Sequence, residues 1–389
     1  MKQRLALNMI VGAGDGPVLN RLMSSYDMKK LFDEIVIVRT TDDQEVISVI
    51  NQYADKTTKF EWNTEDFPKG NFGGARDSAR LLTNSEWIMW LDSDDMLASE
   101  EDMDKIFSRI KSILVSHSDR DYFVCPYILG ISDKGEPTNV ISRERIFKRQ
   151  STIQWIKPIH EQLTINTEIH KRADLNGLDI LHCPVKTGEQ SAIRNIEILE
   201  NEYLKSNKER HDAFYYGRDL IQLDRWENAV SILIDFIETA NEDLSCVYDA
   251  SLLIAKFFMY KQLPDKKQTS LCETTSPIAE QYARICLSIT ESNAEPYTVL
   301  GDVYISQRRN RDAIRMFKQA MTKQFGTGSL QDRSFYEEMP ARRLAELFVW
   351  ENELEQAIWY NKVAMKHCPE DKNLIEQRKK IITKLQETV

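Results

Sequence analysis

Short β-rich runs alternate with amphipathic helical patterns over residues 1 to about 185. The run "RLALNMIV" is typical of a buried strand, "VLNRLMSSYDMKKLF" of an amphipathic helix, and "DEIVIVRT" of a second strand. Strands that alternate with helices of this length form βαβ units, which build a mostly parallel sheet. Ligands of such sheets bind beyond the carboxyl ends of the strands. We therefore expect a functional site at that edge.

From about residue 190 the β pattern gives way to long amphipathic helices with an internal repeat. Small residues recur twelve positions apart, one in each of two consecutive predicted helices: Gly217 and Ala229, Gly301 and Ala313, Ala345 and Ala357. A larger side chain at these places would push the two helices apart. A shared register of this kind indicates stacked helical hairpins, and the alternative is an unrelated helical bundle.

The two patterns predict two domains joined by a connecting helix. We expect an α/β domain over residues 1–187, the connecting helix over 188–209, and an all-α superhelical domain over 210–389. The last would hold about four degenerate repeats, with insertions near 263–276 and 328–337.

Composition excludes several classes of protein. Hydrophobic residues at 42% and charged residues at 29% are typical of a soluble globular protein. No apolar run approaches the ~18 residues of a membrane span, and the start lacks a signal peptide, so we expect no membrane association and a cytoplasmic location. Six scattered cysteines without a C-x-x-C pair argue against a disulfide framework or a structural zinc site.

An apolar run in "NSEWIMWLDSDDML" ends in three acids, Asp92, Asp94 and Asp95. Asp95, or Ser99, could cap the helix that follows. A calcium loop is a second interpretation, but the Gly and closing Glu of an EF-hand are absent. The third is a site that holds a divalent cation against a diphosphate. A D-x-D motif alone does not decide between these interpretations.

The neighbouring residues match a known pattern. The segment from Asn71 to Leu97 resembles the core of family 2 glycosyltransferases, which have the Rossmann-like GT-A fold. The matching residues are Phe72, Ala75, Arg76, Trp87, Ile88, Trp90, Leu91, Asp92, Asp94 and Asp95, with Asp77 in place of the usual Asn. "RERIFKRQSTIQWIKPIHEQL" and "DILHCPVKTGEQ" are similar to later segments of the same enzymes.

The helical half resembles the tetratricopeptide repeat. Its third unit matches that pattern at Tyr297, Leu300, Gly301, Tyr304, Ala313, Phe317 and Ala320. The whole chain is thus similar to the subgroup of family 2 that includes peptide S-glycosyltransferases with such repeats. The resemblance implies a nucleotide-sugar donor, here a UDP-sugar, and Mn²⁺ or Mg²⁺ as cofactor.

The chain departs from the family at two nucleotide-contacting loops. After the first strand, Val11 leads into "GAGDG" where the family has Asn-Glu. After the second strand, Arg39 begins "RTTDD" where the family has "D-T-G-S". The resemblance places Val11 and Arg39 at the nucleotide, and the departures leave the base open.

The resemblance also implies roles for the acidic segment. Asp92 would contact the donor ribose or the metal, Ser93 would contact the donor, and Asp94 would ligate the metal. Arg76 is a candidate donor contact, because guanidinium suits base and phosphate oxygens. A surface salt bridge is the alternative for Arg76.

Two histidines compete for the remaining metal position. His182 matches the C-terminal histidine of many GT-A enzymes, and His160 is the runner-up; a structural role is the alternative for both. Glu161 is the candidate general base for inverting transfer. It could instead be solvated, or pair with Arg143, Arg145 or His160. Trp155 would stack on the acceptor or, as a safer assignment, fill the core.

The predicted function is inverting, metal-dependent transfer of a sugar to a macromolecular acceptor, which could be a protein or peptide, a glycan or a modified DNA base. The repeats would hold the acceptor or mediate homo-oligomerisation. A net charge of −10 opposes DNA, but basic groups recur in the helical half: Arg308, Arg309, Arg311, Arg315, Arg342, Arg343, Arg378, Lys379 and Lys380. They could equally be solvated helix faces. The alternative function is a non-catalytic, repeat-based interaction protein with a degenerate transferase domain.

Overall fold

The computed structural model describes residues 4–67, 69–132, 134–184, 188–205, 210–239, 244–261, 269–326, 328 and 331–388. The chain divides into two compact units, Met1–Asp224 and Arg225–Val389, called the first and second unit below. Each unit is described by itself. Within the described residues, no helix is both long and apolar enough to cross a bilayer.

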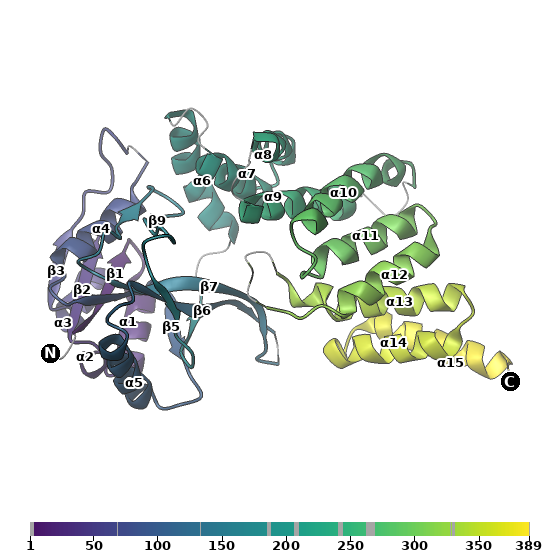
Figure 1. Cartoon of the computed structure of the whole chain (residues 1–389), viewed down its shortest axis with the longest axis horizontal. Helices are drawn as coiled ribbons and strands as arrows, with labels where there is room; N and C mark the ends of the chain where they lie inside the picture. The colour runs from purple at the N-terminus through teal and green to yellow at the C-terminus, as the bar shows by residue number, and fades with distance from the viewer. Residues whose placement is uncertain are drawn as a thin grey trace. The chain divides into compact units, whose positions relative to one another are not determined.

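A nine-stranded sheet forms the centre of the first unit (Figure 1). Its strands follow the order β3-β2-β1-β4-β7-β6-β11-β5, with β10 beside β6. They are β1 (Leu5–Val11), β2 (Glu34–Arg39), β3 (Lys56–Lys59), β4 (Trp87–Trp90), β5 (Asp95–Ala98), β6 (Tyr122–Ile131), β7 (Pro137–Lys148), β10 (Arg172–Asp174) and β11 (Asp179–His182). A short ribbon, β8 (Trp155–Ile156) and β9 (Gln162–Leu163), lies outside this sheet.

The pairing confirms the predicted mostly parallel α/β sheet. β1 pairs in parallel with β2 and β4, β2 with β3, and β6 with β10 and β11. The antiparallel pairs are β4 with β7, β6 with β7, and β5 with β11. Because β1, β2 and β4 are parallel, their carboxyl ends meet at one edge, as the prediction requires.

Helices cover both faces of this sheet. The helices α1 (Gly16–Ser25), α2 (Met28–Leu31), α3 (Gln44–Tyr53) and α5 (Met103–Ser116) bury their apolar sides in one core cluster, which includes alternate residues of β1 from Leu5 to Val11. The helix α4 (Phe72–Leu82) packs Ala75 and Ala79 against Val36 and Val38 on the opposite face. Alternate residues of β1 and β2 are therefore buried on opposite faces, which explains the continuous apolar runs in the sequence.

Two further helices, α6 (Gly188–Lys205) and α7 (Arg210–Gln222), belong to the first compact unit. From the sequence, 188–209 is a connecting helix and residue 210 begins the repeats. The compact units instead divide after Asp224. The limits of the functional domains at 187 and 209 stay predictions.

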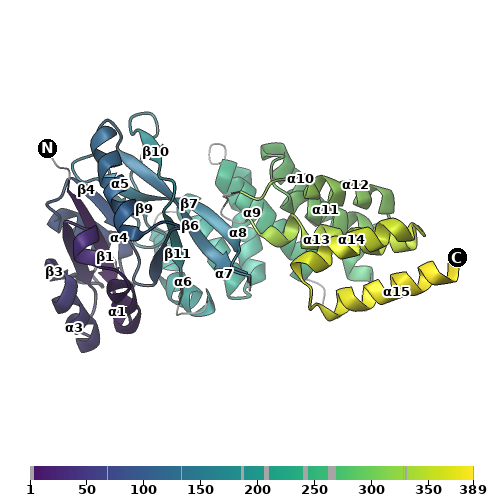
Figure 2. The ribbon, with the colours of Figure 1, turned by 90° about the horizontal axis from the view of Figure 1, so that it is seen from below.

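The second unit is entirely helical within its described residues, as predicted. It contains α8 (Trp226–Thr239), α9 (Leu244–Lys256), α10 (Thr269–Ile289), α11 (Glu295–Ser306), α12 (Asn310–Met321), α13 (Glu338–Trp350), α14 (Leu354–His367) and α15 (Lys372–Thr388). Two short turns, Phe257–Lys261 and Arg333–Phe335, add to these helices. Consecutive helices pack side by side, as Figure 2 shows for α13 and α14.

The small residues of the repeat are buried where the helices meet. Gly301 lies on α11, and a Cβ atom there would come within 2.5 Å of the Phe317 ring on α12. Ala345 on α13 and Ala357 on α14 are fully buried. Of the predicted insertions near 263–276 and 328–337, residues 269–276 are helical in α10, whereas 263–268, 329 and 330 lie outside the described residues.

Candidate functional site

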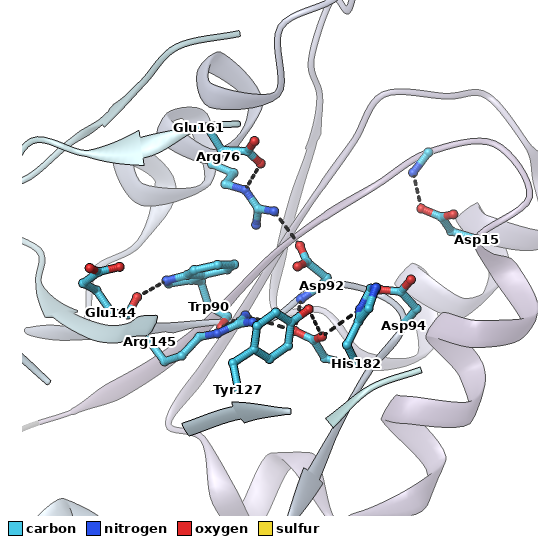
Figure 3. A network of polar contacts seen from close by, with 12 residues as sticks. Asp15, Arg76, Trp90, Asp92, Asp94, Tyr127, Glu144, Arg145, Glu161 and His182 are labelled. Atoms are coloured by element: carbon cyan, nitrogen blue, oxygen red, sulfur yellow. Dashed lines mark hydrogen bonds and ion pairs between the residues drawn. The ribbon is translucent and has the colours of Figure 1, made fainter. Parts of the chain in front are cut away.

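The acidic segment forms a turn between two strands. β4 ends at Trp90, and β5 begins at Asp95. β5 runs antiparallel to β11, and this register pairs Asp95 with His182. Side chains from two distant parts of the sequence thereby meet at the carboxyl edge of the sheet (Figure 3).

Asp95 anchors this turn and does not cap a helix, so that interpretation was wrong. The next helix, α5, begins at Met103 and is capped by Asp102. Asp95 is fully buried and accepts hydrogen bonds from the hydroxyl of Tyr127 at 2.9 Å, from Nη1 of Arg145 at 3.0 Å and from the backbone N–H of Asp92 at 2.9 Å. These bonds fix the backbone that presents Asp92 and Asp94.

The buried cation that faces Asp95 is held between two aromatic rings. The Arg145 guanidinium carbon lies 3.8 Å from the ring centroid of Trp90 and 4.1 Å from that of Tyr127. Arg145 is fully buried. Cation–π contacts compensate part of the desolvation cost of the guanidinium, and the ion pair with Asp95 compensates more of it.

Asp94 and His182 form a candidate metal centre together with Asp95. One ligand atom of each lies within 4.8 Å of the others. The Nδ1 atom of His182 is 3.7 Å from Oδ1 of both Asp94 and Asp95, which is too long for a hydrogen bond. Among the described residues this buried nitrogen has no hydrogen-bond partner. A buried polar atom of this kind requires an explanation, and a bound cation is one.

The pKa shifts of Asp94 and His182 indicate that the cluster carries more negative charge than its own cations neutralise. Burial and the carboxylates of Asp92 and Asp95 raise the pKa of Asp94 above its ordinary value, against the effect of His182. Burial would lower the pKa of His182, but Asp95 and Asp94 outweigh it and raise that pKa. Carboxylate oxygen and imidazole nitrogen are acceptable ligands for Mn²⁺, so the residues fit the implied cofactor.

Asp92 lies outside this group of three and binds Arg76. Nη2 of Arg76 is 2.5 Å from Oδ1 of Asp92, and Nε is 2.6 Å from Oε1 of Glu161. Arg76 is only 8% exposed, so it is not in a surface salt bridge. Burial would raise the pKa of Asp92, but the nearby guanidiniums of Arg76 and Arg145 lower it to about 2. Asp92 is therefore ionised at neutral pH.

The predicted general base shares this guanidinium. Glu161 pairs with Arg76. The partners considered from the sequence were Arg143, Arg145 and His160. The rings of Trp90 and Trp155 flank Arg76, with centroids 4.7 and 5.2 Å from its guanidinium carbon. Trp155 is buried against Trp90 and so fills the core, the safer of its two predicted roles.

His160 lies away from the metal candidates. Its Nε2 atom is 2.9 Å from Oδ2 of Asp219 on α7, and its ring stacks on Tyr215 at 4.3 Å with an interplanar angle of 16°. The structure therefore brings His182, and not His160, beside Asp94. His160 has a structural partner, as the alternative for a lone histidine predicted.

The candidate nucleotide residues lie at the same edge of the sheet. Val11 at the end of β1 is in register with Arg39 at the end of β2. Nη1 of Arg39 lies 2.5 Å from Oδ1 of Asp42. Asp43 accepts a 3.0 Å hydrogen bond from the backbone N–H of Gly14, which links the two loops that depart from the family. Ser93, in the acidic turn, is 8% exposed.

Three residues of the site have roles that the sequence did not assign. The first is Arg145. It stands beside the apolar Ile146 and Phe147 in the buried part of β7, and an arginine there requires a buried partner. Tyr127 and Asp219 are the others. Their neighbours in the sequence contain no signal for either, because both contacts join distant segments.

The comparisons with known proteins find sequence relatives among glycosyltransferases. No protein-family model matches the chain. Two relatives, the SPbeta prophage-derived glycosyltransferase SunS of Bacillus subtilis (strain 168) and the glycosyltransferase SunS of Bacillus phage SPbeta, are each 27% identical over 218 residues. That match covers 53% of this chain and 47% of each relative, so the chain spans about half the length of these curated relatives. The predicted resemblance to glycosyltransferases is confirmed.

Similar solved structures cover about half of the chain or most of it. TTC0263, a TPR protein of Thermus thermophilus, is 14% identical and covers 50% of this chain and 95% of its own, with a TM-score of 0.33. MamA is 13% identical and covers 48% of this chain and 97% of its own, with a TM-score of 0.36. TarS 1–349 of S. aureus is 11% identical and covers 82% of this chain and 91% of its own, with a TM-score of 0.32. Scores of this size do not define a fold, which rests here on strand order and helix packing.

Proposed function

We propose that this chain is an inverting glycosyltransferase that uses a divalent metal ion and a nucleotide-sugar donor. The observation that carries the proposal is the meeting of Asp94 and His182 at the carboxyl edge of the sheet, where the buried Nδ1 of His182 has no hydrogen-bond partner among the described residues. The neighbouring Asp92–Arg76–Glu161 network supplies further polar groups at this edge. The relatives named glycosyltransferase SunS support the same reaction class.

Glycosyl transfer leaves negative charge on the departing nucleoside diphosphate. Mn²⁺ or Mg²⁺ held by Asp94 and His182, with Asp95 or Asp92 nearby, would neutralise that charge as a Lewis acid. Ionised Asp92 would accept hydrogen bonds from the donor ribose, next to Ser93. Val11 and Arg39 would contact the nucleotide, which we expect to be UDP.

Glu161 is the group that would remove the acceptor's proton. Its Oε1 atom is held by Arg76, and among the described residues its Oε2 atom has no hydrogen bond. A carboxylate fixed through one oxygen can receive a proton on the other. Attack on the face of the sugar opposite to the diphosphate would invert the anomeric centre.

A protein, peptide or glycan is favoured over DNA as the acceptor. Several basic groups of the second unit are paired with acids: Arg309 and Arg315 with Asp312, Arg342 with Glu338 and Asp371, Arg343 with Asp302 and Glu346, and Lys380 with Glu376. Cations engaged in this way contribute little to phosphate binding. The helical repeats would hold the acceptor or associate with a second copy of the chain.

Calorimetric titration with a panel of nucleotide sugars, with and without Mn²⁺, tests the proposal. We expect one donor to bind with a Kd in the micromolar-to-millimolar range that is usual for enzyme substrates, and at least about tenfold more weakly without the metal. If no donor binds under either condition, the proposal is wrong, and the non-catalytic interaction protein becomes the better account.

A further inference from the structure

The loop that carries Glu161 is held in an unfavourable backbone conformation. Lys157 has a φ of 68° and His160 a φ of 47°, and neither is a glycine. Non-glycine residues in the left-handed region cost on the order of 1–3 kcal/mol each, so they persist only where the surroundings enforce them. The residues that enforce this conformation therefore also set the position of Glu161.

One side of the loop packs against the first turn of α4, the helix that carries Arg76. The backbone N–H of Phe72 donates a 2.7 Å hydrogen bond to the carbonyl of Pro158. At Gly73, a Cβ atom would lie 2.2 Å from the carbonyl oxygen of Lys157, so only glycine allows this approach. These contacts hold the loop against α4 at Lys157 and Pro158 and do not involve His160.

The other side of the loop is attached to α7 through both of its left-handed residues. Nζ of Lys157 lies 3.4 Å from Oδ1 of Asp212, and Nε2 of His160 lies 2.9 Å from Oδ2 of Asp219. The two carboxylates are seven residues apart, two turns of helix, and so share one face of α7. Tyr215, between them in sequence, stacks on His160.

Asp219 is itself rigidly placed. It is 1% exposed, Oδ1 is 2.9 Å from Nη2 of Arg218, and Oδ2 accepts a 3.3 Å hydrogen bond from Asn195 on α6. Nη2 of Arg218 also lies 3.1 Å from Nε2 of His160. A carboxylate this buried and this well paired is a fixed point to which a loop can be anchored.

We propose that Asp212 and Asp219 of α7 are positioning residues for the transfer reaction, because they hold the Lys157–His160 segment and thereby Glu161 against Arg76. The inference rests on the proposed function of Glu161. According to this inference α7 contributes to catalysis, although the sequence pattern groups this helix with the repeats. Neither carboxylate has to touch the donor, the metal or the acceptor.

Variants of the full-length chain test this role. Asp219→Asn keeps the shape of the side chain but removes its charge, and Asp212→Asn does the same at the second anchor. Asp174→Asn, in an exposed pair with Arg172, is the matched control. For each variant we would measure kcat with the donor found by calorimetry, the Kd for that donor with Mn²⁺, and hydrogen–deuterium exchange of peptides that cover residues 155–163.

We expect Asp219→Asn to lower kcat about 10- to 100-fold, because a displacement of about 1 Å at a reacting group has effects of this size. The donor Kd should change by less than about twofold, since the metal candidates are untouched, and exchange in 155–163 should rise. Asp212→Asn should show the same pattern more weakly, and Asp174→Asn should match the wild type.

Unchanged exchange of residues 155–163 in both variants would overturn the inference, and so would faster exchange with unchanged kcat. A parallel loss of donor binding and thermal stability would also contradict it, because that pattern indicates general unfolding. Absence of activity in the wild type with every donor would count against the proposed function instead. The exchange data would still decide whether α7 restrains the loop.

Discussion

Replacing Asp94 with Asn is expected to lower metal-dependent donor cleavage by about 10³-fold. A metal ion that neutralises a leaving diphosphate contributes several kcal/mol to the barrier, and each 1.36 kcal/mol is a factor of ten. Asp94 lies beside His182 and is less tightly engaged than Asp95, which Tyr127 and Arg145 already bind. Asp94 is therefore the carboxylate of the cluster most available to a cation.

The measurement is release of nucleoside diphosphate over a Mn²⁺ titration, with Asp174→Asn as the control for loss of a surface carboxylate. Asp94→Asn should remove the response to Mn²⁺, while its thermal stability equals or exceeds that of the wild type, because an acid whose pKa is raised on folding destabilises the folded state at neutral pH. A variant that still responds to Mn²⁺ with wild-type affinity would exclude Asp94 as a ligand.

Replacing Arg145 with Met is expected to destabilise the first unit by about 3–5 kcal/mol, because it leaves the charge of Asp95 buried without its cation. Both side chains are fully buried. Asp95 also holds the backbone N–H of Asp92, so the acidic turn should loosen and donor binding should weaken as well.

Urea-dependent hydrogen exchange of peptides from β4 and β7 would report this loss in the first unit alone. Arg172→Met, which removes an exposed ion pair with Asp174, is the matched control and should cost less than about 1 kcal/mol. If the two variants proved equally stable, the Arg145–Asp95 pair would not be the anchor of the turn.

The sequence predicts the edge of the sheet well, because the signals there are local or linked to strand ends. The acids after β4 and the histidine at the end of β11 each follow a short apolar run. Parallel strands bring the ends of such runs to one edge of the sheet. The contact between Asp94 and His182 requires more than this, because it depends on the antiparallel pairing of β5 with β11, and the sequence pattern did not indicate β5 as a separate strand.

The partners of the site could not be predicted in the same way. An aspartate after a strand caps a helix as readily as it anchors a turn, and only the burial of Arg145 between Trp90 and Tyr127 decides which role Asp95 takes. The attachment of His160 to Asp219 joins residues 59 positions apart. The repeat pattern reflects helix packing alone and groups α7 with the repeats, whereas the compact units divide after Asp224; the predicted domain limit at residue 209 stays a prediction.

Release of UDP or another nucleoside diphosphate by the purified chain, with its best donor and Mn²⁺, tests the central proposal most directly when wild type and Glu161→Gln are compared. We expect metal-dependent release from the wild type, and a loss of about 10²–10⁴-fold in Glu161→Gln, the range of a general base, with donor affinity unchanged within about threefold. Equal release from both proteins, or none from the wild type with any donor, would contradict this account.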